Sequence, residues 1–384
     1  MSRADDHLYM ARALRLAERA VGSTAPNPAV GCVLVRDGRI VGEGYTRPPG
    51  GPHAEVVALA AAGADARGAT AYVTLEPCDH TGRTGPCSRA LIDAGVARVV
   101  CAVLDPNPVA GSGVERLRAA GIDVDVGVLE AQARAVNRGF FARMTRRRPW
   151  LRSKLAASLD GRTALANGES QWITGPDARR DVHRYRANAG AILTGIGTVL
   201  ADDPQLTARP DEPQTDPAAQ SPRGPLRAIV DAKLETPPAA RVLRAPGAVV
   251  LFTTAPEAEI AECRQRIRDA ARDLADAPDV RIERVAGRER CDLVDVVERL
   301  AALEVNDVWV EAGPVLNGAL LERGLIDELV LYLAPHLLGD RARGLFSLAP
   351  LESLDERVRL TIDDVRRIGD DLRIIARPEA QGGG

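Results

Sequence analysis

The sequence predicts an α/β protein made of two consecutive domains. Its 384 residues fit two or three domains at roughly 150 residues each. In both halves, short apolar runs typical of buried strands alternate with segments of helical periodicity, as expected for helices packed on a sheet. An arginine-rich run, residues 143–148, followed by Pro149, interrupts this alternation and predicts a solvated linker. We therefore expect one domain over residues 1–146 and a second over residues 147–380.

The first domain is expected to be a mixed sheet with helices on both faces. Met10, Leu14 and Ala17 recur at helical spacing and predict a helix over residues 6–21. The apolar run at 29–36 predicts a buried strand, which ends at Asp37-Gly38 in a hairpin-type turn and pairs with residues 39–44. The later predicted elements are helices at 53–62, 86–94, 111–120 and 131–141, and strands at 71–75, 98–104 and 123–128.

The second domain alternates again and is expected to close with an antiparallel pair of strands. The predicted strands lie at 151–159, 191–194, 226–231, 248–253, 280–285, 307–311, 328–333, 357–362 and 371–375. The predicted helices lie at 176–187, 258–274, 292–302 and 315–323. Residues 210–225 are proline-rich and are expected to form a long surface loop.

Composition and charge exclude several classes of protein. A net charge of −3 and only 3% aromatic residues argue against a nucleic-acid partner. No apolar run approaches the roughly 18 residues that span a bilayer, and the first residues lack the pattern of a signal peptide, so we expect a cytoplasmic protein. Six cysteines in a chain of this length do not form a disulfide framework. Where they cluster, metal binding or catalysis is the better interpretation.

The clearest chemical signal is a set of potential zinc ligands. His53 and Glu55 open one predicted helix, Cys78 follows a predicted strand, and Cys87 opens another helix. Catalytic zinc sites use three protein ligands of this kind and keep a fourth position for water, whose pKa falls to roughly 7. His53, Cys78 and Cys87 are such a set, and Glu55 is then placed to shuttle protons. The H-x-E motif with later cysteines is the signature of zinc deaminases.

The spacing of the two cysteines leaves alternatives open. Eight residues separate Cys78 from Cys87, whereas the usual signature is C-x-x-C. A structural zinc site would need a fourth ligand, which His80 can supply, although that interpretation leaves the H-x-E motif unexplained. A cluster that binds no metal is the other alternative.

Two segments resemble those of the bifunctional riboflavin-biosynthesis deaminase–reductases. They are TLEPCDHTGRTGPC at residues 74–87 and, upstream of it, Asn27-Pro28-Ala29-Val30-Gly31. In that family the long spacing between the cysteines is usual, and the family's T-P-P-C reads T-G-P-C here. The resemblance implies a cytidine-deaminase-like three-layer α/β/α domain. It implies Zn²⁺ on His53, Cys78 and Cys87, with Glu55 as the proton shuttle. It also implies substrate contacts, which lie at Asn27, His80 and Arg83.

The second half carries only weak nucleotide-binding motifs when its residues are taken alone. Gly195-Ile-Gly197 lacks the third glycine of a dinucleotide fingerprint, and residues 313–318, GPVLNG, lack the lysine of a phosphate-binding loop. Residues 308–313 nevertheless predict a strand that enters a glycine-containing turn and then a helix. Backbone N–H groups at such a turn suit a cofactor pyrophosphate.

The resemblance continues through residues 154–163, 168–174, 198–204 and 311–318, and implies a dihydrofolate-reductase-like α/β domain. The implied NADPH contacts are Ala157, Trp172, Thr198, Asp202, Gly313, Pro314, Val315, Leu316, Asn317 and Gly318. The implied substrate contacts are Ser170, Arg186, Leu206, Arg209 and Glu311, with the two arginines on the phosphate. Lys154 and Asp160 are candidates for acid–base chemistry.

The expected function is therefore that of an enzyme with two active sites. One removes an exocyclic amine from a diaminopyrimidine ribosyl phosphate as ammonia, and the other uses NADPH to reduce the ribosyl group to ribityl. The alternatives are a non-catalytic protein with structural zinc and nucleotide sensing, or a deaminase of another nucleobase or nucleotide. We expect a small-molecule partner, no nucleic acid or membrane, and a homo-oligomer.

Overall fold

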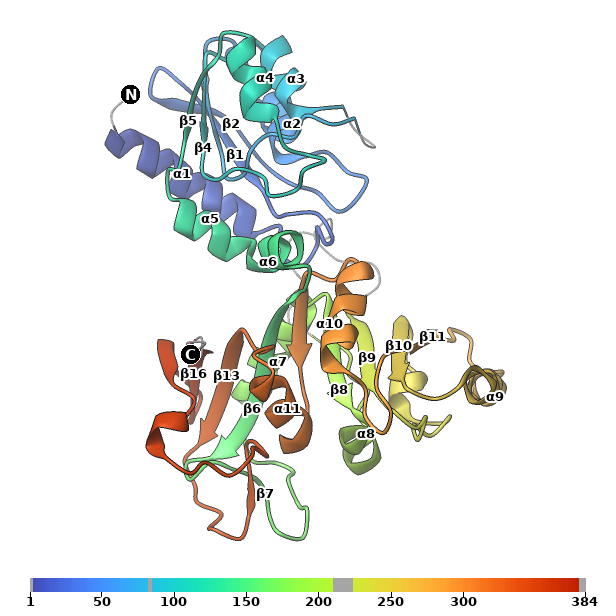
Figure 1. The fold of residues 1–384 in the computed structure, drawn as a ribbon. Helices are drawn as coiled ribbons and strands as arrows, with labels where there is room; N and C mark the ends of the chain where they lie inside the picture. The colour runs from blue at the N-terminus through green and yellow to red at the C-terminus, as the bar shows by residue number, and fades with distance from the viewer. Residues whose placement is uncertain (1–2, 82–84, 210–223, 380–384) are drawn as a thin grey trace. The chain divides into compact units, whose positions relative to one another are not determined.

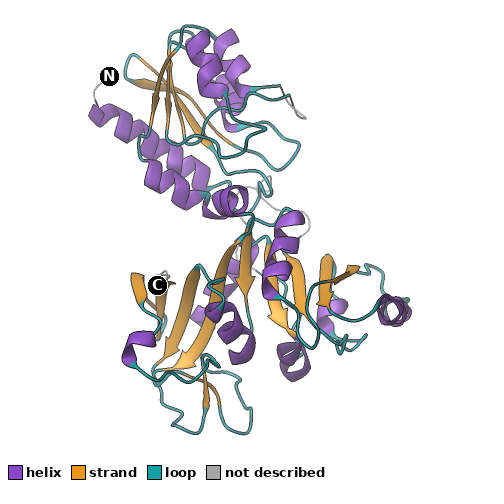
Figure 2. Cartoon of the chain, viewed as in Figure 1, coloured by secondary structure: helices purple, strands orange, loops and turns teal. Residues whose placement is uncertain are grey.

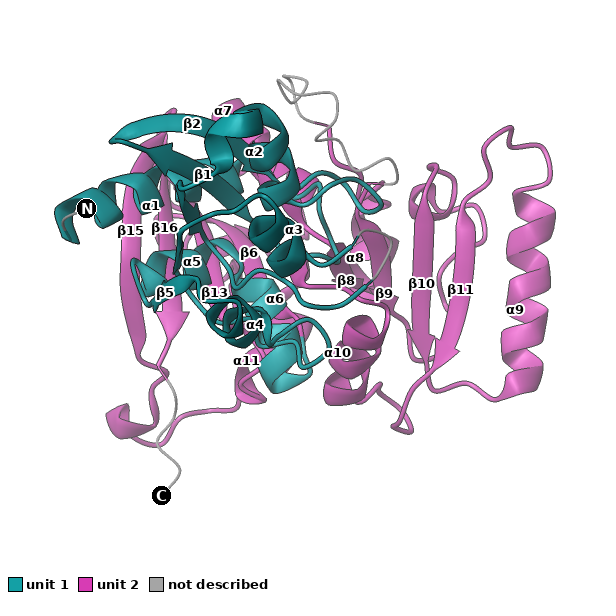
Figure 3. Ribbon diagram, turned by 90° about the horizontal axis from the view of Figure 1, so that it is seen from above, with its two compact units in different colours: residues 1–148, 213–222 teal, residues 149–212, 223–384 magenta. Residues whose placement is uncertain are grey.

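A computed structural model describes residues 3–81, 85–209 and 224–379, and the structural statements below concern these ranges. The chain divides into two compact units (Figure 3). Unit 1 covers the described residues up to 148, and unit 2 covers those from 149 onward. The surface loop predicted at 210–225 falls largely on residues outside the described ranges, as does Arg83.

Unit 1 is built on a mixed five-stranded sheet, as the sequence predicts. Its strands are β1 (Gly31–Arg36), β2 (Arg39–Tyr45), β3 (Thr70–Val73), β4 (Arg98–Cys101) and β5 (Asp123–Val126), in the order β2-β1-β3-β4-β5. β1 pairs antiparallel with β2 and β3, whereas β3, β4 and β5 are mutually parallel. The carboxyl ends of β3 and β4 therefore meet at one edge of the sheet.

Helices cover both faces of this sheet (Figures 1 and 2). On one side lie α1 (Arg3–Glu18) and α5 (Glu130–Val136), continued by α6 (Arg138–Arg146), and on the other α2 (Ala54–Ala62), α3 (Cys87–Asp93) and α4 (Gly113–Ala119). Glycines allow backbone contact on each face. A Cβ at Gly31 would lie 2.0 Å from the Ala13 carbonyl oxygen of α1, and one at Gly44 would lie 2.4 Å from that of Ala54 in α2. This close approach fixes the start of α2 on the sheet.

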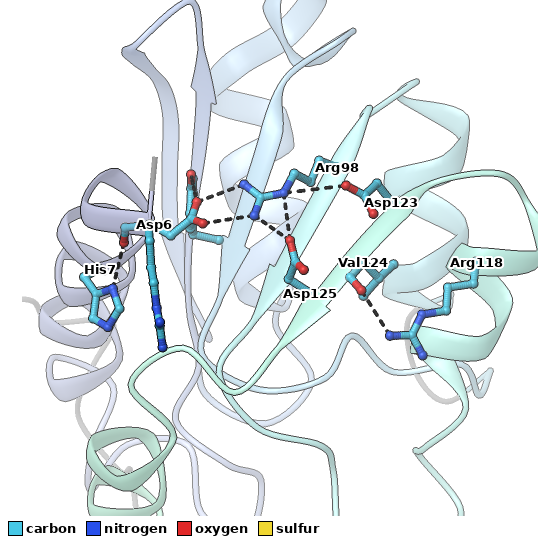
Figure 4. Close-up of polar contacts among 9 residues, drawn as sticks. Asp6, His7, Arg98, Arg118, Asp123, Val124 and Asp125 are labelled. Carbon is cyan, nitrogen blue, oxygen red and sulfur yellow. Dashed lines mark hydrogen bonds and ion pairs between the residues drawn. The ribbon is translucent and has the colours of Figure 1, made fainter. Parts of the chain in front are cut away.

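One arginine ties together three elements of unit 1 (Figure 4). Arg98 in β4 donates to both carboxylate oxygens of Asp6 in α1, at 2.9 and 3.0 Å, and its Nη2 lies 2.5 Å from Oδ2 of Asp125 in β5. Tyr72 in β3 donates to the same Asp6 at 2.8 Å. These bonds lower the pKa of Asp6, chiefly through Arg98. The network fixes α1 across the middle of the sheet.

Unit 2 contains a nine-stranded sheet in the order β11-β10-β9-β8-β12-β6-β13-β16-β15. Neighbouring strands are parallel from β11 to β13, and β16 and β15 close the sheet as the expected antiparallel pair. The strands are β6 (Trp150–Ser158), β8 (Ala191–Gly195), β9 (Leu226–Val230), β10 (Ala248–Thr253), β11 (Asp279–Arg284), β12 (Asp307–Val310), β13 (Glu328–Ala334), β15 (Leu360–Ile368) and β16 (Asp371–Pro378). A separate pair joins β7 (Arg162–Ala164) to β14 (Arg343–Gly344).

Two hydrophobic clusters cover the faces of the large sheet. Side chains of α7 (Pro176–Asn188) and α9 (Glu257–Ala270) pack in one cluster, which includes Trp309 and Tyr332. Side chains of α10 (Leu293–Ala302) and α11 (Pro314–Glu322) pack in the other. The remaining helices are α8 (Ile196–Asp202) and the short 3-10 turns at Gly63–Ala66, Arg241–Leu243 and Leu354–Glu356. None of the described helices is long and apolar enough to cross a membrane.

Two local expectations were wrong, and one helix was not predicted. The single helix predicted at 131–141 is broken at Asn137, which leaves helical geometry and turns its side chain to the backbone of Ala29. The linker predicted at the arginine run is helical as far as Arg146, because α6 buries Phe140 and Phe141. Helix α8 was not predicted, since its glycines at 195 and 197 suggest a turn; Gly195 is its N-cap residue.

Candidate active sites

The three predicted zinc ligands of unit 1 lie together. His53 Nδ1 is 3.3 Å from Cys87 Sγ and 3.5 Å from Cys78 Sγ, and the three ligand atoms all lie within 4.8 Å of one another. Cys87 is fully buried and Cys78 is nearly so. One imidazole nitrogen and two sulfurs at this separation fit tetrahedral zinc.

Local structure explains why these ligands converge. His53 is the N-cap residue of α2, Cys87 is the first residue of α3, and Cys78 lies in the loop after β3. Two bonds tie that loop to α3: the Ser88 amide donates to the Cys78 carbonyl at 3.1 Å, and the Ser88 hydroxyl donates to Asp79 at 2.5 Å. The eight-residue spacing between the cysteines is therefore closed by hydrogen bonds beside both ligands.

The two neighbouring thiols, Cys78 and Cys87, share a single negative charge. Hydrogen bonding by Cys87 and His53 lowers the pKa of Cys78 to about 4, against the effect of burial. The same contact with Cys78, together with burial, raises the pKa of Cys87 far above its usual value. A bound metal ion would take both sulfurs as thiolates. The donor set thus fits zinc in chemistry as well as in geometry.

Glu55 lies in the first turn of α2 and is only 3% exposed. Burial is the main cause that raises its pKa to about 7, and the charge of Cys78 adds to the effect. A carboxyl group with a pKa near neutrality can both accept and return a proton. The structure thus places a proton-exchanging group beside the predicted ligands without making it one of them.

His80 does not complete a four-ligand site. Among the described residues, the group that can hold a metal contains His53, Cys78 and Cys87 and not His80. The Nδ1 atom of His80 is buried and has no hydrogen-bond partner in the part of the chain that the structure describes. A three-ligand site with one open position is the arrangement of catalytic zinc.

Two further residues support this site and were missed from the sequence. Glu76, 7% exposed, accepts hydrogen bonds from the Asp105 amide at 3.1 Å and the Val114 amide at 2.9 Å, and so joins the loops after β3 and β4. Asn137 exchanges two 2.8 Å bonds with the backbone of Ala29, two residues after Asn27. Asn27 itself is exposed in the loop that these bonds hold. Neither contact has a local sequence signal.

In unit 2 the central feature is a largely buried ion pair, with side chains 13% and 14% exposed. Arg186 of α7 contacts Glu311, just after β12, through Nε–Oε1 at 2.5 Å and Nη2–Oε2 at 2.6 Å. Its remaining Nη1 donates to the Thr207 carbonyl at 3.1 Å. Trp309 Nε1 donates to Glu311 Oε1 at 2.8 Å. Burial acts to raise the pKa of Glu311, but Arg186 outweighs it and holds that pKa at about 2.

Lys154 interacts with this pair, and Asp202 interacts with Lys154. Burial lowers the pKa of Lys154 on β6, while the charges of Glu311 and Asp202 oppose that effect. Burial raises the pKa of Asp202, at the end of α8, and Lys154 opposes it. Four elements thus bring two cations and two carboxylates together. Such a cluster of shifted pKa values is typical of an active site.

Asp160, the other acid–base candidate, has a structural role. It accepts bonds from the Ser158 hydroxyl and from the amides of Leu338 and Gly339, at 2.5, 3.1 and 2.8 Å. These bonds, led by that of Ser158, hold its pKa at about 2. Asp160 therefore fastens the turn after β6 to the segment that follows β13.

The remaining residues implied for unit 2 differ in what they offer a ligand. Leu206 is 2% exposed and packs in the core, and Ala157 is buried within β6, so only their backbones are available. Trp172 is 69% exposed with Arg179 stacked over its ring at 4.6 Å, so it is not a core residue. Ser170 and Thr198 are half-buried, and Arg209 is exposed.

The turn at residues 313–318 is partly committed to packing. Asn317 accepts a bond from the Ser153 hydroxyl and donates to the Ala312 carbonyl, both at 2.7 Å, and a Cβ at Gly318 would lie 2.1 Å from the Ser347 carbonyl oxygen. Gly313, the N-cap residue of α11, has open space where a Cβ would stand among the described atoms. Pro314, Leu316 and the exposed Val315 follow in the first turn. The uncapped amides there fit a cofactor phosphate.

Comparisons with known proteins give one family match for each unit. Residues 3–103 match the cytidine and deoxycytidylate deaminase zinc-binding region, and residues 149–374 match the RibD C-terminal domain. The chain is 49% identical to riboflavin biosynthesis protein RibD of Escherichia coli, with 96% of this chain and 98% of that protein covered. It is 42% identical to the same protein of Aquifex aeolicus, with 97% and 99% covered.

Solved structures give the same result over the full chain. The RibD structure from Acinetobacter baumannii superposes with a TM-score of 0.87 at 40% identity, covering 98% of this chain and all of the other. A diaminohydroxyphosphoribosylaminopyrimidine deaminase/5-amino-6-(5-phosphoribosylamino)uracil reductase from Thermotoga maritima gives 0.81 at 33% identity, with 98% and 99% covered. The chain therefore belongs to the RibD family of riboflavin biosynthesis proteins.

Proposed function

We propose that this protein is a bifunctional enzyme of riboflavin biosynthesis that deaminates a diaminopyrimidine ribosyl phosphate and then reduces the product. The deaminase is assigned to residues 1–146 and the NADPH-dependent reductase to residues 147–380. The observation that carries the proposal is the buried Glu55 beside a three-ligand His–Cys–Cys site. A non-catalytic structural zinc site does not fit, because His80 lies outside the ligand group.

In the deaminase, His53, Cys78 and Cys87 would hold zinc, which would supply Lewis-acid chemistry to a water molecule. Glu55 transfers protons. It takes one proton from the water and passes it to a ring nitrogen, then takes the second proton from the added hydroxyl group and passes it to the departing amine, so that oxygen replaces the amine and ammonia leaves. Its pKa of about 7 suits both directions of transfer. Asn27 holds the pyrimidine, and His80 and Arg83 line the ribose-phosphate side.

In the reductase, NADPH supplies the hydride, and the protein positions the reactants. The cofactor contacts are assigned to Ala157, Trp172, Thr198, Asp202 and the turn at 313–318. Ser170, Arg186, Leu206, Arg209 and Glu311 are assigned to the substrate. Arg186 and Arg209 supply positive charge for the phosphate. Because the guanidinium of Arg186 donates to Glu311 and Thr207, Arg186 also holds Glu311 in place.

A deaminase of another nucleobase or nucleotide remains the second candidate, but it leaves the charged cluster of unit 2 without a purpose.

We further propose that the enzyme acts on a small molecule and not on nucleic acid, in agreement with its net charge of −3. A cytoplasmic location suits its six thiols, all of them free and buried. We propose a homo-oligomer as well, and light scattering after gel filtration measures its mass.

Substitution of Glu55 by Gln tests the assignment of two separate sites. The amide has the shape of the carboxylate but cannot exchange the proton, so ammonia release should fall by at least about a thousandfold, while bound zinc remains. NADPH oxidation on added 5-amino-6-(5-phosphoribosylamino)uracil should be unchanged. Ammonia release and zinc content are measured on the same preparation. Loss of both activities together contradicts the two-site assignment.

A further inference from the structure

Trp309 is a buried polar side chain at the reductase site that the proposed mechanism leaves unused. It lies on β12, two residues before Glu311, and is 1% exposed. Residues two apart on a strand point to the same face of the sheet. The indole thus lies beneath the carboxylate and donates its N–H to Glu311 Oε1 at 2.8 Å.

The hydrogen bonds of Glu311 leave a defined part of its carboxylate unoccupied. Oε1 accepts from Trp309 Nε1 and from Arg186 Nε, and Oε2 accepts from Arg186 Nη2. Each carboxylate oxygen can accept about two hydrogen bonds. Among the residues that the structure describes, these contacts therefore fill the acceptor sites of Oε1 and leave one on Oε2. The direction of that acceptor depends on how the carboxylate is rotated.

Trp309 lies on the sheet, and its N–H is the donor that fixes the rotation of the Glu311 carboxylate. Arg186 reaches Glu311 from α7, so the ion pair alone would follow any movement of the helix. The indole is anchored on both sides: it packs in the core between the sheet and α7, and its ring stacks on Tyr185 at 4.7 Å with an interplanar angle of 12°. Tyr185 is the neighbour of Arg186 in α7. One rigid side chain thus sets the carboxylate and supports the helix that carries its counter-ion.

We propose that Trp309 is a positioning residue of the reductase, which orients Glu311 so that Oε2 accepts a hydroxyl group of the substrate's ribosyl chain. The proposal rests on the proposed reductase function. It assigns Glu311 to a sugar hydroxyl rather than to the phosphate, since an ionised carboxylate repels a phosphate. The role of Trp309 is therefore specificity for a polyhydroxylated chain, exerted through Glu311.

The first test replaces Trp309 by Phe, which keeps a stacking ring and removes the N–H. With 5-amino-6-(5-phosphoribosylamino)uracil, kcat/KM for NADPH oxidation should fall about tenfold, as expected for one lost hydrogen bond to a charged group, and mainly through a higher substrate KM. KM for NADPH and ammonia release should not change. Tyr332→Phe is the matched control, because it removes one donor from another buried carboxylate, Asp181, on the same face of the sheet. This control should keep its reductase KM.

A double-mutant cycle separates positioning from general stability. In an enzyme carrying Glu311→Ala, which removes the acceptor of the indole N–H, the added Trp309→Phe should change kcat/KM less than about twofold, because its effect acts through Glu311. Full additivity of the two substitutions contradicts the proposal, and so does an equal loss in Trp309→Phe and Tyr332→Phe.

A spectroscopic measurement does not depend on how the Phe variant folds. The indole N–H resonance of Trp309 in the wild-type protein, labelled with ¹⁵N at tryptophan, should lie downfield and be protected from exchange, and Glu311→Gln should shift it. A resonance that Glu311→Gln leaves unmoved overturns the proposal. A wild-type enzyme that cannot oxidise NADPH contradicts the proposed function and this role together. Normal wild-type kinetics with an unchanged Trp309→Phe variant contradict the role of Trp309 alone.

Discussion

The two candidate sites differ in how far apart in the sequence their residues lie. In unit 1 the ligands His53 and Cys87 are 34 positions apart, and Glu55 and Cys78 lie between them. In unit 2 the charged cluster joins Lys154, Arg186, Asp202 and Glu311 from four elements, and Arg186 and Glu311 alone are 125 positions apart. A metal needs a few rare residue types, whereas a site that positions a cofactor and a substrate uses common charged residues.

That difference in chemistry makes the first site depend on single atoms and the second on a network. Each ligand of a three-ligand metal site is indispensable, because the metal has no other protein donor there. In the charged cluster, Glu311 has three donors and Arg186 has two acceptor groups, so one deletion leaves part of the network in place. The predictions below test this contrast, from the largest expected effect to the smallest.

Substitution of Cys87 by Ser should give the largest effect. Loss of one thiolate, and so of one ligand of three, should remove zinc from the purified protein and lower ammonia release by at least about a thousandfold. NADPH oxidation on the deaminated substrate should be unchanged. Metal analysis and the two assays measure this directly. Cys101→Ser is the matched control, since Cys101 is an equally buried thiol of unit 1 that donates to the Val103 carbonyl outside the ligand group. Zinc retained at full occupancy in Cys87→Ser would contradict the ligand assignment.

Substitution of Asn137 should have an intermediate effect on the deaminase, because Asn137 acts through its bonds to the backbone of Ala29. Asn137→Ala removes both bonds to Ala29 and should release the loop that carries Asn27. Since Asn27 is proposed to hold the pyrimidine, the substrate KM for deamination should rise about tenfold, with zinc content and reductase kinetics unchanged. Glu130→Gln on α5 is the control, because its partner Arg134 lies on the same exposed face. A fall in kcat at constant KM would show that the loop does not hold the substrate.

The same contrast explains what was predictable from the sequence. The zinc cluster and Glu55 were predicted because the residue types are rare and the helix starts are marked locally. The bond of Asn137 to Ala29 was not, because it joins a residue that looks like ordinary helix to a partner 108 positions away. The bond of Trp309 to Glu311 was not, because a tryptophan two positions before a glutamate on a predicted strand looks like ordinary core. Resemblance alone pointed to Leu206, and the structure buries its side chain at a φ of 53°. Long-range contacts leave no periodic pattern in the sequence. The sequence therefore predicts the class of sheet but not the order of its strands.

The smallest expected effect concerns stability and tests whether the units fold separately. Asp6→Asn should lower the unfolding free energy of unit 1 by about 1–2 kcal/mol at pH 7, because Arg98 keeps Asp125 as a partner. Since Arg98 depresses the pKa of Asp6, the stabilisation is present above the unfolded pKa of 3.8 and is lost as the pH falls through the lower folded value. The difference between wild type and variant should therefore shrink below about pH 4.

The placement of the tryptophans allows this effect to be assigned to one unit. All three, Trp150, Trp172 and Trp309, belong to unit 2, so their fluorescence during urea unfolding follows unit 2 alone, whereas far-UV circular dichroism follows the whole chain. Asp6→Asn should shift the circular dichroism curve and leave the fluorescence midpoint in place. If both curves shift together, the two units unfold as one, and the separate treatment of their sites loses its thermodynamic basis. If only the first shifts, a substitution in unit 1 can be interpreted without a correction for unit 2.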